Sequence, residues 1–284
     1  MQATSRPVRS VLYIPGSKSR ALDKAKSLAA DAIIFDLEDA VAPEEKPAAR
    51  TLLADTLTPG AYGTRMALLR VNGLDTPWGA ADLAAGAGMA VDAILLPKVN
   101  GPADVDAAAQ HAPDAMFWAM IETAEGVLNA LSIAKHPKMG GFVLGTNDLA
   151  KELGCETGGN RMPLMASLQI ALLGARAGAI PCVDGVYNAF KDDDGLRVEC
   201  DQGATLGMDG KTLIHPAQLE IANAVFAPSE ADIAQAERVI AAHKAAIAAG
   251  EGVAVLDGKI IENLHVVTAE ATLSKARAIS ELGQ

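Results

Sequence analysis

Carboxyl side chains follow three short apolar runs of this chain near the point where each run ends. Glu38 and Asp39 come directly after AIIFDL, Glu122 stands near the end of FWAMIET, and Asp148 follows GFVLGTN. If these runs are strands of one parallel sheet, the carboxylates converge and repel one another unless a cation lies among them. Oxygen ligands without clustered His or Cys favour a hard ion, so we predict Mg²⁺, with Mn²⁺ as a substitute.

Glu122 and Asp148 are the predicted metal ligands because each stands in a short polar turn, IETAEG or GTNDLA, after one of two consecutive runs. Glu38 and Asp39 are expected to hold metal-bound waters. In the alternative interpretation these residues are structural. Asp36, Glu38 and Asp39 then cap the following helix, Asp148 caps DLAKEL, and Glu122 is a solvated loop charge.

Further polar residues stand at the ends of comparable runs: Arg70, Asn72, Lys98, Asn147, Asp184 and His215. Lys98 could contact a ligand or pair with a carboxylate. His215 precedes a proline at a predicted helix start, where packing and capping explain it as well as catalysis does. The turn IPGSKSR offers small residues with Lys18 and Arg20, which suits a phosphate-bearing ligand, although an ordinary surface helix start explains it nearly as well.

Eight runs rich in Val, Ile, Leu and Met supply the strands, and Ala-rich segments with helical periodicity separate them. The runs are 11–15, 32–37, 65–71, 93–99, 117–123, 141–147, 180–186 and 211–216. Their nearly continuous apolar content is typical of parallel strands covered on both faces. Residues 1–226 are therefore predicted to form an α/β fold, a (β/α)₈ TIM barrel, whose active site lies at the carboxyl ends of the strands. A doubly wound open sheet is the alternative.

Residues 227–284 are predicted to form a C-terminal helical extension that acts as a lid or oligomerisation segment. Ser229 is a suitable N-cap for a long Ala-rich helix, Asp257-Gly258 indicates a turn, and a last helix follows. Such a segment cannot build much of a core alone. We expect it to pack on its own barrel, on a neighbouring subunit, or on both.

Composition narrows the class of protein. The 284 residues carry a formal net charge of -11, which argues against a nucleic-acid partner or an anionic membrane surface. Three cysteines in no metal-binding or disulfide pattern fit a reducing cytoplasm. No apolar run has the length of a signal peptide or a membrane span, so we expect a soluble cytoplasmic protein.

The chain resembles the HpcH/HpaI aldolase/citrate lyase superfamily, in its citrate lyase β-subunit-like branch, which includes malyl-CoA lyases and (3S)-malyl-CoA thioesterases. The motifs that carry the resemblance follow one another in order along the chain: RSVLYIPGS, AIIFDLEDAV, LLRVNG, ILLPKV, MIETAEG, VLGTNDLA, DGVYNAFKD and GKTLIHPAQ. The resemblance implies a (β/α)₈ barrel, Mg²⁺ held by Glu122 and Asp148, and a coenzyme A thioester as ligand. It also implies a homotrimer or homohexamer.

The resemblance implies that Arg70 contacts the substrate oxygens, and together with the residue patterns above it gives the full set of expected contacts. The expected substrate or CoA contacts are Arg70, Lys18, Arg20, Tyr13, Lys98, Gly145, Thr146 and Asn147, and the expected catalytic residues are Arg70, Glu38, Asp39, Glu262 and Asp257. In such assemblies the C-terminal segment covers an adjacent subunit's active site and supplies an acid/base carboxylate. Glu262 is aligned where family lyases usually carry Asp, and Asp257 is the second candidate, although Asp-Gly there can simply form the turn.

The main functional prediction is a Mg²⁺-dependent carbon-carbon lyase. It would cleave a β-hydroxyacyl-CoA, such as (3S)-malyl-, methylmalyl- or citramalyl-CoA, to acetyl- or propionyl-CoA and a 2-oxo acid. The first alternative is a (3S)-malyl-CoA thioesterase that releases malate and CoA. Further alternatives are a citrate lyase β subunit that needs an acyl-carrier partner, an aldolase of free hydroxy-acids, and a non-catalytic scaffold.

Overall fold

The structure is a computed structural model that describes residues 6–156, 160–250 and 252–282. These residues divide into two compact units. The larger unit is Val8–Phe226, and the smaller one contains the described residues from Ala227 onward together with Arg6 and Pro7.

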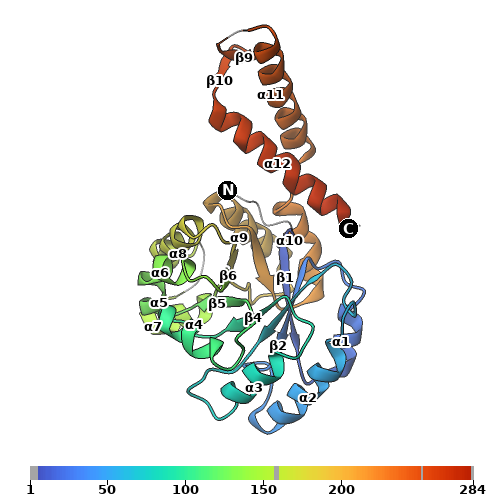
Figure 1. The fold of residues 1–284 in the computed structure, drawn as a ribbon, viewed down its shortest axis with the longest axis vertical. Coiled ribbons are helices and arrows are strands. Elements are labelled where there is room, and N and C mark those ends of the chain that lie inside the picture. The colour runs from blue at the N-terminus through green and yellow to red at the C-terminus, as the bar shows by residue number, and fades with distance from the viewer. Residues whose placement is uncertain (1–5, 157–159, 251, 283–284) are drawn as a thin grey trace. The chain divides into compact units, whose positions relative to one another are not determined.

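Eight parallel strands of the larger unit close into a barrel, in which each strand pairs with the next and the eighth pairs with the first (Figure 1). The strands are β1 Ser10–Pro15, β2 Ala32–Asp36, β3 Met66–Arg70, β4 Ala93–Leu96, β5 Phe117–Ile121, β6 Met139–Leu144, β7 Cys182–Asp184 and β8 Gly210–Leu213. The predicted (β/α)₈ barrel is thereby confirmed, and the open-sheet alternative is wrong because β1 and β8 are hydrogen-bonded neighbours.

Helices surround the barrel and separate its strands along the chain (Figure 1). They are α1 Ser19–Ala25, α2 Lys46–Thr56, α3 Gly79–Gly86, α4 Pro102–Ala109, α5 Ala124–Leu128, α6 Ala130–Ala134, α7 Thr146–Leu153, α8 Met165–Ala177, α9 Asp193–Leu206 and α10 Leu219–Val225. Short 3₁₀ turns, η1 Pro43–Glu45, η2 Met162–Leu164 and η3 Pro216–Gln218, precede α2, α8 and α10.

Each strand is buried on both faces, which explains the continuous apolar runs in the sequence. One face fills the barrel interior, where Ile34, Leu68 and Val143 belong to a compact cluster. The other face packs under the helices, where Ile33, Phe35 and Phe142 belong to a larger one. Because successive side chains of a strand point to opposite faces, both clusters draw on the same short runs.

Apart from β1, the strands are shorter than the runs that predict them, and several of the polar residues therefore lie after the strand ends. β4 ends at Leu96 because Pro97 has no N–H to continue the ladder. Lys98 follows with a φ of 50°, a left-handed backbone conformation. Glu122 and Asn147 likewise lie just after β5 and β6, so the site is built on the turns that follow the strands.

The smaller unit is an antiparallel helical pair with a small hairpin. α11 Glu230–Ala248 and α12 Asn263–Glu281 pack against each other, and β9 Ala254–Leu256 pairs with β10 Lys259–Ile261 between them in the chain. This confirms the predicted C-terminal helical extension. Ser229 caps α11 as predicted, since its hydroxyl accepts a hydrogen bond from the backbone N–H of Asp232.

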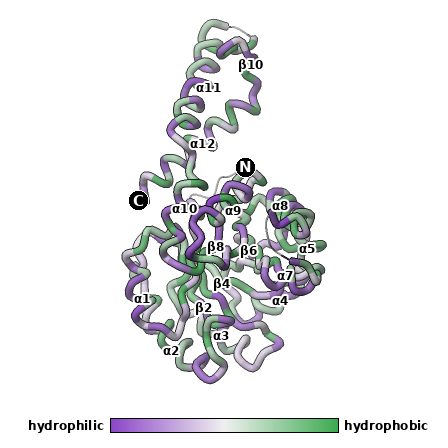
Figure 2. Tube along the Cα trace, turned by 180° about the vertical axis from the view of Figure 1, so that it is seen from behind, coloured by the Kyte–Doolittle hydropathy of each residue, from purple (hydrophilic) through white to green (hydrophobic). Residues whose placement is uncertain are grey.

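Hydrophobic and hydrophilic residues are interspersed along the smaller unit (Figure 2). Its exposed large apolar residues are Ile247, Val253, Val255, Ile260, Leu264 and Val267, whereas most of its buried apolar residues are alanines. None of the helices in the described part of the chain has the length and apolar character needed to span a lipid bilayer.

Candidate active site

Arg70 is the centre of a group of charges at the carboxyl ends of β2 and β3. These strands pair in a register that sets Asp36 beside Arg70. The guanidinium donates two hydrogen bonds to Asp36, from Nε to Oδ1 at 2.8 Å and from Nη2 to Oδ2 at 2.6 Å. Its Nη1 lies 2.7 Å from Oε2 of Glu38 and 3.4 Å from Oδ2 of Asp39. Burial disfavours the charged guanidinium, but Asp36 and Glu38 outweigh that effect and raise the pKa of Arg70.

Glu122 is a buried carboxyl group in the turn after β5, with 2% of its surface exposed. Its Oε1 accepts a hydrogen bond of 2.8 Å from the backbone N–H of Lys98. Burial raises the pKa of Glu122 to about 8, and the negative charges of Glu38 and Asp148 add to that rise. The N–H of Lys98 and the charge of Arg70 oppose it only in part.

Glu38 is a second carboxyl group whose pKa is raised because burial outweighs the nearby positive charge. Burial raises its pKa to about 7, against the opposing charge of Arg70, while Asp39 and Asp36 reinforce the rise. We call Asp36, Glu38, Asp39, Arg70, Glu122 and Asp148 the strand-end cluster. It combines five carboxyl groups with one guanidinium. Asp39 is exposed, but the other four carboxyl groups are buried or half-buried. Such an excess of carboxylates is the environment that a bound cation stabilises.

The structure does not support the alternative in which Asp36, Glu38 and Asp39 cap the following helix, although Asp36 has a structural role in the turn before it. Its carboxylate accepts hydrogen bonds from the backbone N–H groups of Glu38 and Ala40, and so closes the turn after β2. No side chain caps η1 or α2. Glu38 and Asp39 therefore direct their carboxylates at Arg70 and not at a helix start.

The pair Glu122 and Asp148 fits a hard divalent ion by its donor chemistry. Asp148 lies in the first turn of α7, on the strand end next to that of Glu122. Both offer carboxylate oxygens, and Oε2 of Glu122 has no hydrogen-bond partner among the described residues. The described residues contain no group of three or more His, Cys, Asp or Glu that could hold a metal ion. A pair of carboxylates suits Mg²⁺, which usually keeps several waters and leaves positions for substrate oxygens.

Gly145 allows Glu122 to occupy this position. A Cβ atom at residue 145 would lie 2.3 Å from Oε2 and 2.4 Å from Cβ of Glu122. Both distances are shorter than real carbon contacts. Gly145 was predicted as a substrate contact, and the structure gives it a packing role against the Glu122 side chain.

The other predicted ligand contacts lie around this cluster. Tyr13 is partly buried, and the Arg70 guanidinium carbon lies 4.9 Å from the centroid of its ring. Thr146 is buried at the start of α7. Lys98 binds Glu122 through its backbone N–H, and its exposed side chain lowers the pKa of Glu38 by its charge.

The predicted phosphate contacts lie in solvent after β1. Lys18 and Arg20 are both exposed, and Lys18 forms a loose ion pair of 3.6 Å with Glu45. Exposed pairs of this kind contribute little to stability, so Lys18 can leave its partner for another anion at small cost.

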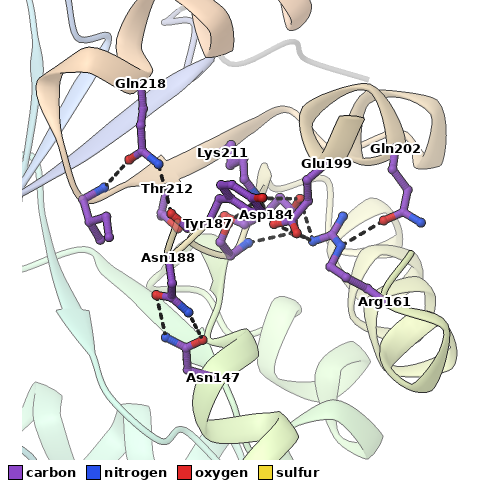
Figure 3. Close-up of polar contacts among 12 residues, drawn as sticks. Asn147, Arg161, Asp184, Tyr187, Asn188, Glu199, Gln202, Lys211, Thr212 and Gln218 are labelled. Carbon is purple, nitrogen blue, oxygen red and sulfur yellow. Dashed lines mark hydrogen bonds and ion pairs between the residues drawn. The ribbon is translucent and has the colours of Figure 1, made fainter. Parts of the chain in front are cut away.

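Asn147 is exposed, and its side-chain amide is engaged by a second asparagine (Figure 3). Asn147 Nδ2 donates to Oδ1 of Asn188 at 3.3 Å, and Asn188 Nδ2 donates back to Oδ1 of Asn147 at 2.9 Å. The reciprocal pair joins the start of α7, which carries Asp148, to the loop after β7.

Asp184 does not belong to the strand-end cluster, contrary to our expectation. Its carboxylate accepts hydrogen bonds from Nη1 of Arg161 and Nζ of Lys211, and Lys211 also donates to Glu199 of α9 (Figure 3). Burial would raise the pKa of Asp184, but Lys211 and Arg161 outweigh it and lower that pKa. We call Arg161, Asp184, Glu199 and Lys211 the β7–β8 cluster.

His215 has a structural partner, as the alternative interpretation allows, and Asn72 has structural partners as well. His215 Nδ1 accepts a hydrogen bond from the N–H of Ala217 and so caps η3. Asn72 donates through Nδ2 to the Leu37 carbonyl and to Asp82.

The two carboxylates predicted from the C-terminal segment lie in the smaller unit. Asp257 and Gly258 form the hairpin turn with φ values of 51° and 74°, and Arg238 donates to the Asp257 carboxylate at 2.6 Å. The exposed Glu262 precedes α12, and its backbone N–H donates to Nδ1 of His265. Its carboxylate has no hydrogen bond or ion pair within the part of the chain that the structure describes. Asp257 therefore has a turn-forming role, whereas the Glu262 carboxylate is available.

The model of the HpcH/HpaI aldolase/citrate lyase family matches residues 9–216, which contain the whole strand-end cluster. The chain belongs to this family. That membership confirms the predicted family and the prediction of an enzyme.

Relatives within the HpcH/HpaI family include both predicted activities. The (3S)-malyl-CoA thioesterase of Cereibacter sphaeroides (strain ATCC 17023) is 61% identical over 280 residues, which cover 99% of this chain and 98% of the relative. The L-malyl-CoA/beta-methylmalyl-CoA lyase of C. sphaeroides (strain ATCC 17025) is 35% identical and covers 97% of this chain and 96% of its own. The identities therefore favour the thioesterase alternative over the lyase, our main prediction.

A solved structure supports the same family and fold. Protein CitE from Mycobacterium tuberculosis, crystallised in complex with magnesium, acetoacetate and coenzyme A, superposes with a TM-score of 0.81 at 30% identity. The match covers 96% of this chain and all of that one. A citrate lyase β subunit from the same organism, complexed with oxaloacetate and magnesium, has a TM-score of 0.71 at 31% identity.

Sequence reasoning missed residues that hold the turns of the strand-end cluster in place. Lys46 is buried at the start of α2 and donates through Nζ to the carbonyls of Leu37 and Glu38, which fixes the turn that carries Glu38. Its Nζ also lies 5.2 Å from the centroid of the Trp78 ring. The sequence contains no sign of this role, because a lysine in the first turn of a helix ordinarily lies in solvent. Asn188 was missed because nothing in the sequence indicates that its loop contacts Asn147.

Proposed function

We propose that this protein is a (3S)-malyl-CoA thioesterase, which hydrolyses its substrate to malate and CoA. The observation that carries the proposal is the 61% identity to such a thioesterase over nearly the full length of both chains. The lyase is the second candidate, and the lyase relatives at 35% identity support it. It would form acetyl- or propionyl-CoA and a 2-oxo acid.

Mg²⁺ is the proposed cofactor, with Mn²⁺ as a substitute, and Glu122 and Asp148 are its proposed ligands. The raised pKa of Glu122 supports this assignment, because the buried carboxylate lacks a compensating cation. The magnesium in the CitE crystal structure supports it independently. When bound, the ion would supply a Lewis acid for oxygen atoms of the substrate.

The remaining chemistry is assigned to side chains of the strand-end cluster. Arg70, held in place by Asp36, would stabilise negative charge on the thioester oxygen. Glu38, with a pKa of about 7, would accept a proton from the attacking water near neutral pH. The water oxygen bonds to the thioester carbon, the carbon-sulfur bond breaks, and the CoA thiolate takes up that proton. Lys18 and Arg20 remain the proposed contacts for the CoA phosphates.

The smaller unit is proposed to act as a lid and oligomerisation segment in a cytoplasmic homotrimer or homohexamer. Six exposed large apolar residues in that unit support burial against another copy of the chain. Glu262 is the proposed acid/base carboxylate from this segment, because Asp257 is already engaged by Arg238. The three cysteines are free, as expected in a reducing compartment.

The test is product analysis by mass spectrometry after the purified protein is incubated with (3S)-malyl-CoA and Mg²⁺, with and without a chelator. We expect free CoA and malate, and no turnover with the chelator. Acetyl-CoA and glyoxylate would instead establish the lyase. Activity that appears only after the acyl group is loaded on a carrier protein would establish the citrate lyase β subunit. Undiminished turnover with the chelator would refute the metal site.

A further inference from the structure

Tyr13 places a hydroxyl group inside the barrel, next to the strand-end cluster. The residue lies near the carboxyl end of β1 and packs against the interior cluster of apolar side chains. The Arg70 guanidinium covers one face of its ring, and the negative charges of Asp36, Glu122 and Glu38 all act on its hydroxyl. The hydroxyl therefore belongs to the same small region as the proposed catalytic groups.

The hydroxyl of Tyr13 has only a weak partner. Its Oη lies 3.5 Å from Sδ of Met120, which projects into the barrel from β5. A thioether sulfur is a poor hydrogen-bond acceptor. No other hydrogen-bond partner of this hydroxyl exists among the described residues. Burial raises the pKa of Tyr13, an effect that Arg70 opposes only in part, so the phenol stays a neutral O–H donor near neutral pH.

Packing alone does not explain this hydroxyl. A phenylalanine ring would fill the same interior space and offer the same face to Arg70. Burying a hydroxyl without a strong partner costs free energy that a phenyl ring avoids. A substrate oxygen in the site would supply the missing acceptor.

We propose that the Tyr13 hydroxyl donates a hydrogen bond to the thioester carbonyl oxygen of the bound acyl-CoA and stabilises the oxyanion that forms there, together with Arg70. This inference rests on the proposed function, since it assigns a catalytic contact within the same site. A hydrogen bond to an oxygen that gains charge is stronger in the transition state than in the bound substrate. Loss of the hydroxyl should therefore lower kcat more than it raises KM.

The test compares Tyr13→Phe with Met120→Leu in the full-length protein. Tyr13→Phe removes only the oxygen, and Met120→Leu removes the sulfur to which that oxygen now points while nearly conserving volume. We expect Tyr13→Phe to lower kcat for (3S)-malyl-CoA by about 10- to 100-fold with little change in KM or melting temperature. Met120→Leu should retain kcat within about twofold, because it keeps the proposed donor.

Two results would overturn the inference. One is a kcat for Tyr13→Phe within about twofold of the wild type, and the other is an equal loss in both variants, which would mean that the hydroxyl serves the sulfur contact. A wild type that forms acetyl-CoA and glyoxylate refutes the proposed hydrolysis and leaves this comparison intact. The ratio of kcat for Tyr13→Phe to kcat for the wild type then tests the proposed hydrogen bond in the cleavage reaction, because the same carbonyl oxygen gains charge there.

Discussion

The barrel contains two groups of charged residues that differ in how their charges are balanced. In the β7–β8 cluster, two cations meet two carboxylates, and Asp184 and Lys211 are fully buried. In the strand-end cluster, five carboxyl groups meet one guanidinium. The pKa of Asp184 is lowered in the first cluster, whereas the pKa values of Glu38 and Glu122 are raised to about 7 and 8 in the second.

The difference separates structural charges from charges that await a ligand. A carboxylate with a lowered pKa has already found its cations and contributes to the stability of the fold. A buried carboxyl group with a raised pKa is held in an environment that disfavours its charge, as is common at functional sites. Both clusters contain acidic and basic residues, so the sequence alone does not distinguish them. The ion pairs in the structure show which carboxylates are neutralised.

The largest expected effect comes from Glu122→Gln. This change removes a proposed metal ligand while it keeps the size of the side chain, so turnover of (3S)-malyl-CoA should fall on the order of a thousandfold. Thermal stability of the metal-free protein should stay the same or rise, because Gln does not carry the free-energy cost of holding a buried carboxyl group whose pKa is raised to about 8. Glu125→Gln, an exposed change three residues away, is the matched control for both assays. An active Glu122→Gln variant would contradict the claim that the strand-end cluster is functional and the β7–β8 cluster structural.

Lys211→Met should chiefly lower the stability of the fold, whereas Glu122→Gln should chiefly lower turnover. Lys211→Met leaves Asp184 and Glu199 with Arg161 alone of the two cations that contact both, and breaking a buried pair in this way costs about 3–5 kcal/mol. Urea unfolding measures the loss. Lys26→Met removes an exposed ion pair with Asp23 and should cost less than about 1 kcal/mol. Equal losses in the two variants would contradict a structural role of the β7–β8 cluster.

The pH dependence of stability should carry the sign of the raised pKa values. Between about pH 5 and pH 8, the folded protein retains protons at Glu38 and Glu122 that the unfolded chain has already released. The free energy of unfolding of the metal-free protein should therefore fall as pH rises, by at most about 1.4 kcal/mol per pH unit for each group. Asp184 has a lowered pKa, so its contribution is lost only in acid, as pH falls through that value.

Denaturant unfolding in a series of buffers tests this expectation. Glu122→Gln should flatten the decline, and Mg²⁺ added at pH 8 should reverse part of it, since the ion binds the charged carboxylates. A free energy of unfolding that rises from pH 5 to pH 8 would show that the strand-end cluster is balanced after all.

Asn188→Ala should have the smallest effect. It breaks the reciprocal bond to Asn147, one residue before Asp148, so the Mg²⁺ concentration for half-maximal activity should rise by about two- to fivefold. Tyr187→Phe breaks only a bond to Asp192 in the same loop and should leave the Mg²⁺ requirement unchanged. An equal Mg²⁺ response in the two variants would argue that Asn188 only supports the loop.

The sequence was sufficient to predict the barrel because its strands are buried on both faces. All five residues of β2 are buried, and their apolar run is visible without tertiary information. The meeting of Arg70 with Glu38 and Asp39 was also predictable, since carboxyl ends of neighbouring parallel strands lie at one edge. Fold geometry alone supplies that proximity.

The side-chain direction at the end of a short strand was not predictable. Asp184 ends β7, as Asp36 ends β2, yet its partners are Arg161, which precedes η2, and Lys211, which lies inside β8 and not at its carboxyl end. A lysine within a strand gives no sign that it will neutralise a carboxylate on the neighbouring strand. The roles of Lys46 and Asn188 were not predictable either, because they depend on contacts between separate turns.

Gly145 gives the site a weakness that no inventory of reactive groups would include. Any side chain there would meet the Glu122 carboxylate. In a library of all single substitutions selected for growth on this activity, position 145 should tolerate no replacement, as strictly as Glu122 itself. Glycine at position 145 would then be as intolerant of substitution as the acidic residues of the site. Activity would be lost because the new side chain displaces Glu122, although no reactive group has been changed.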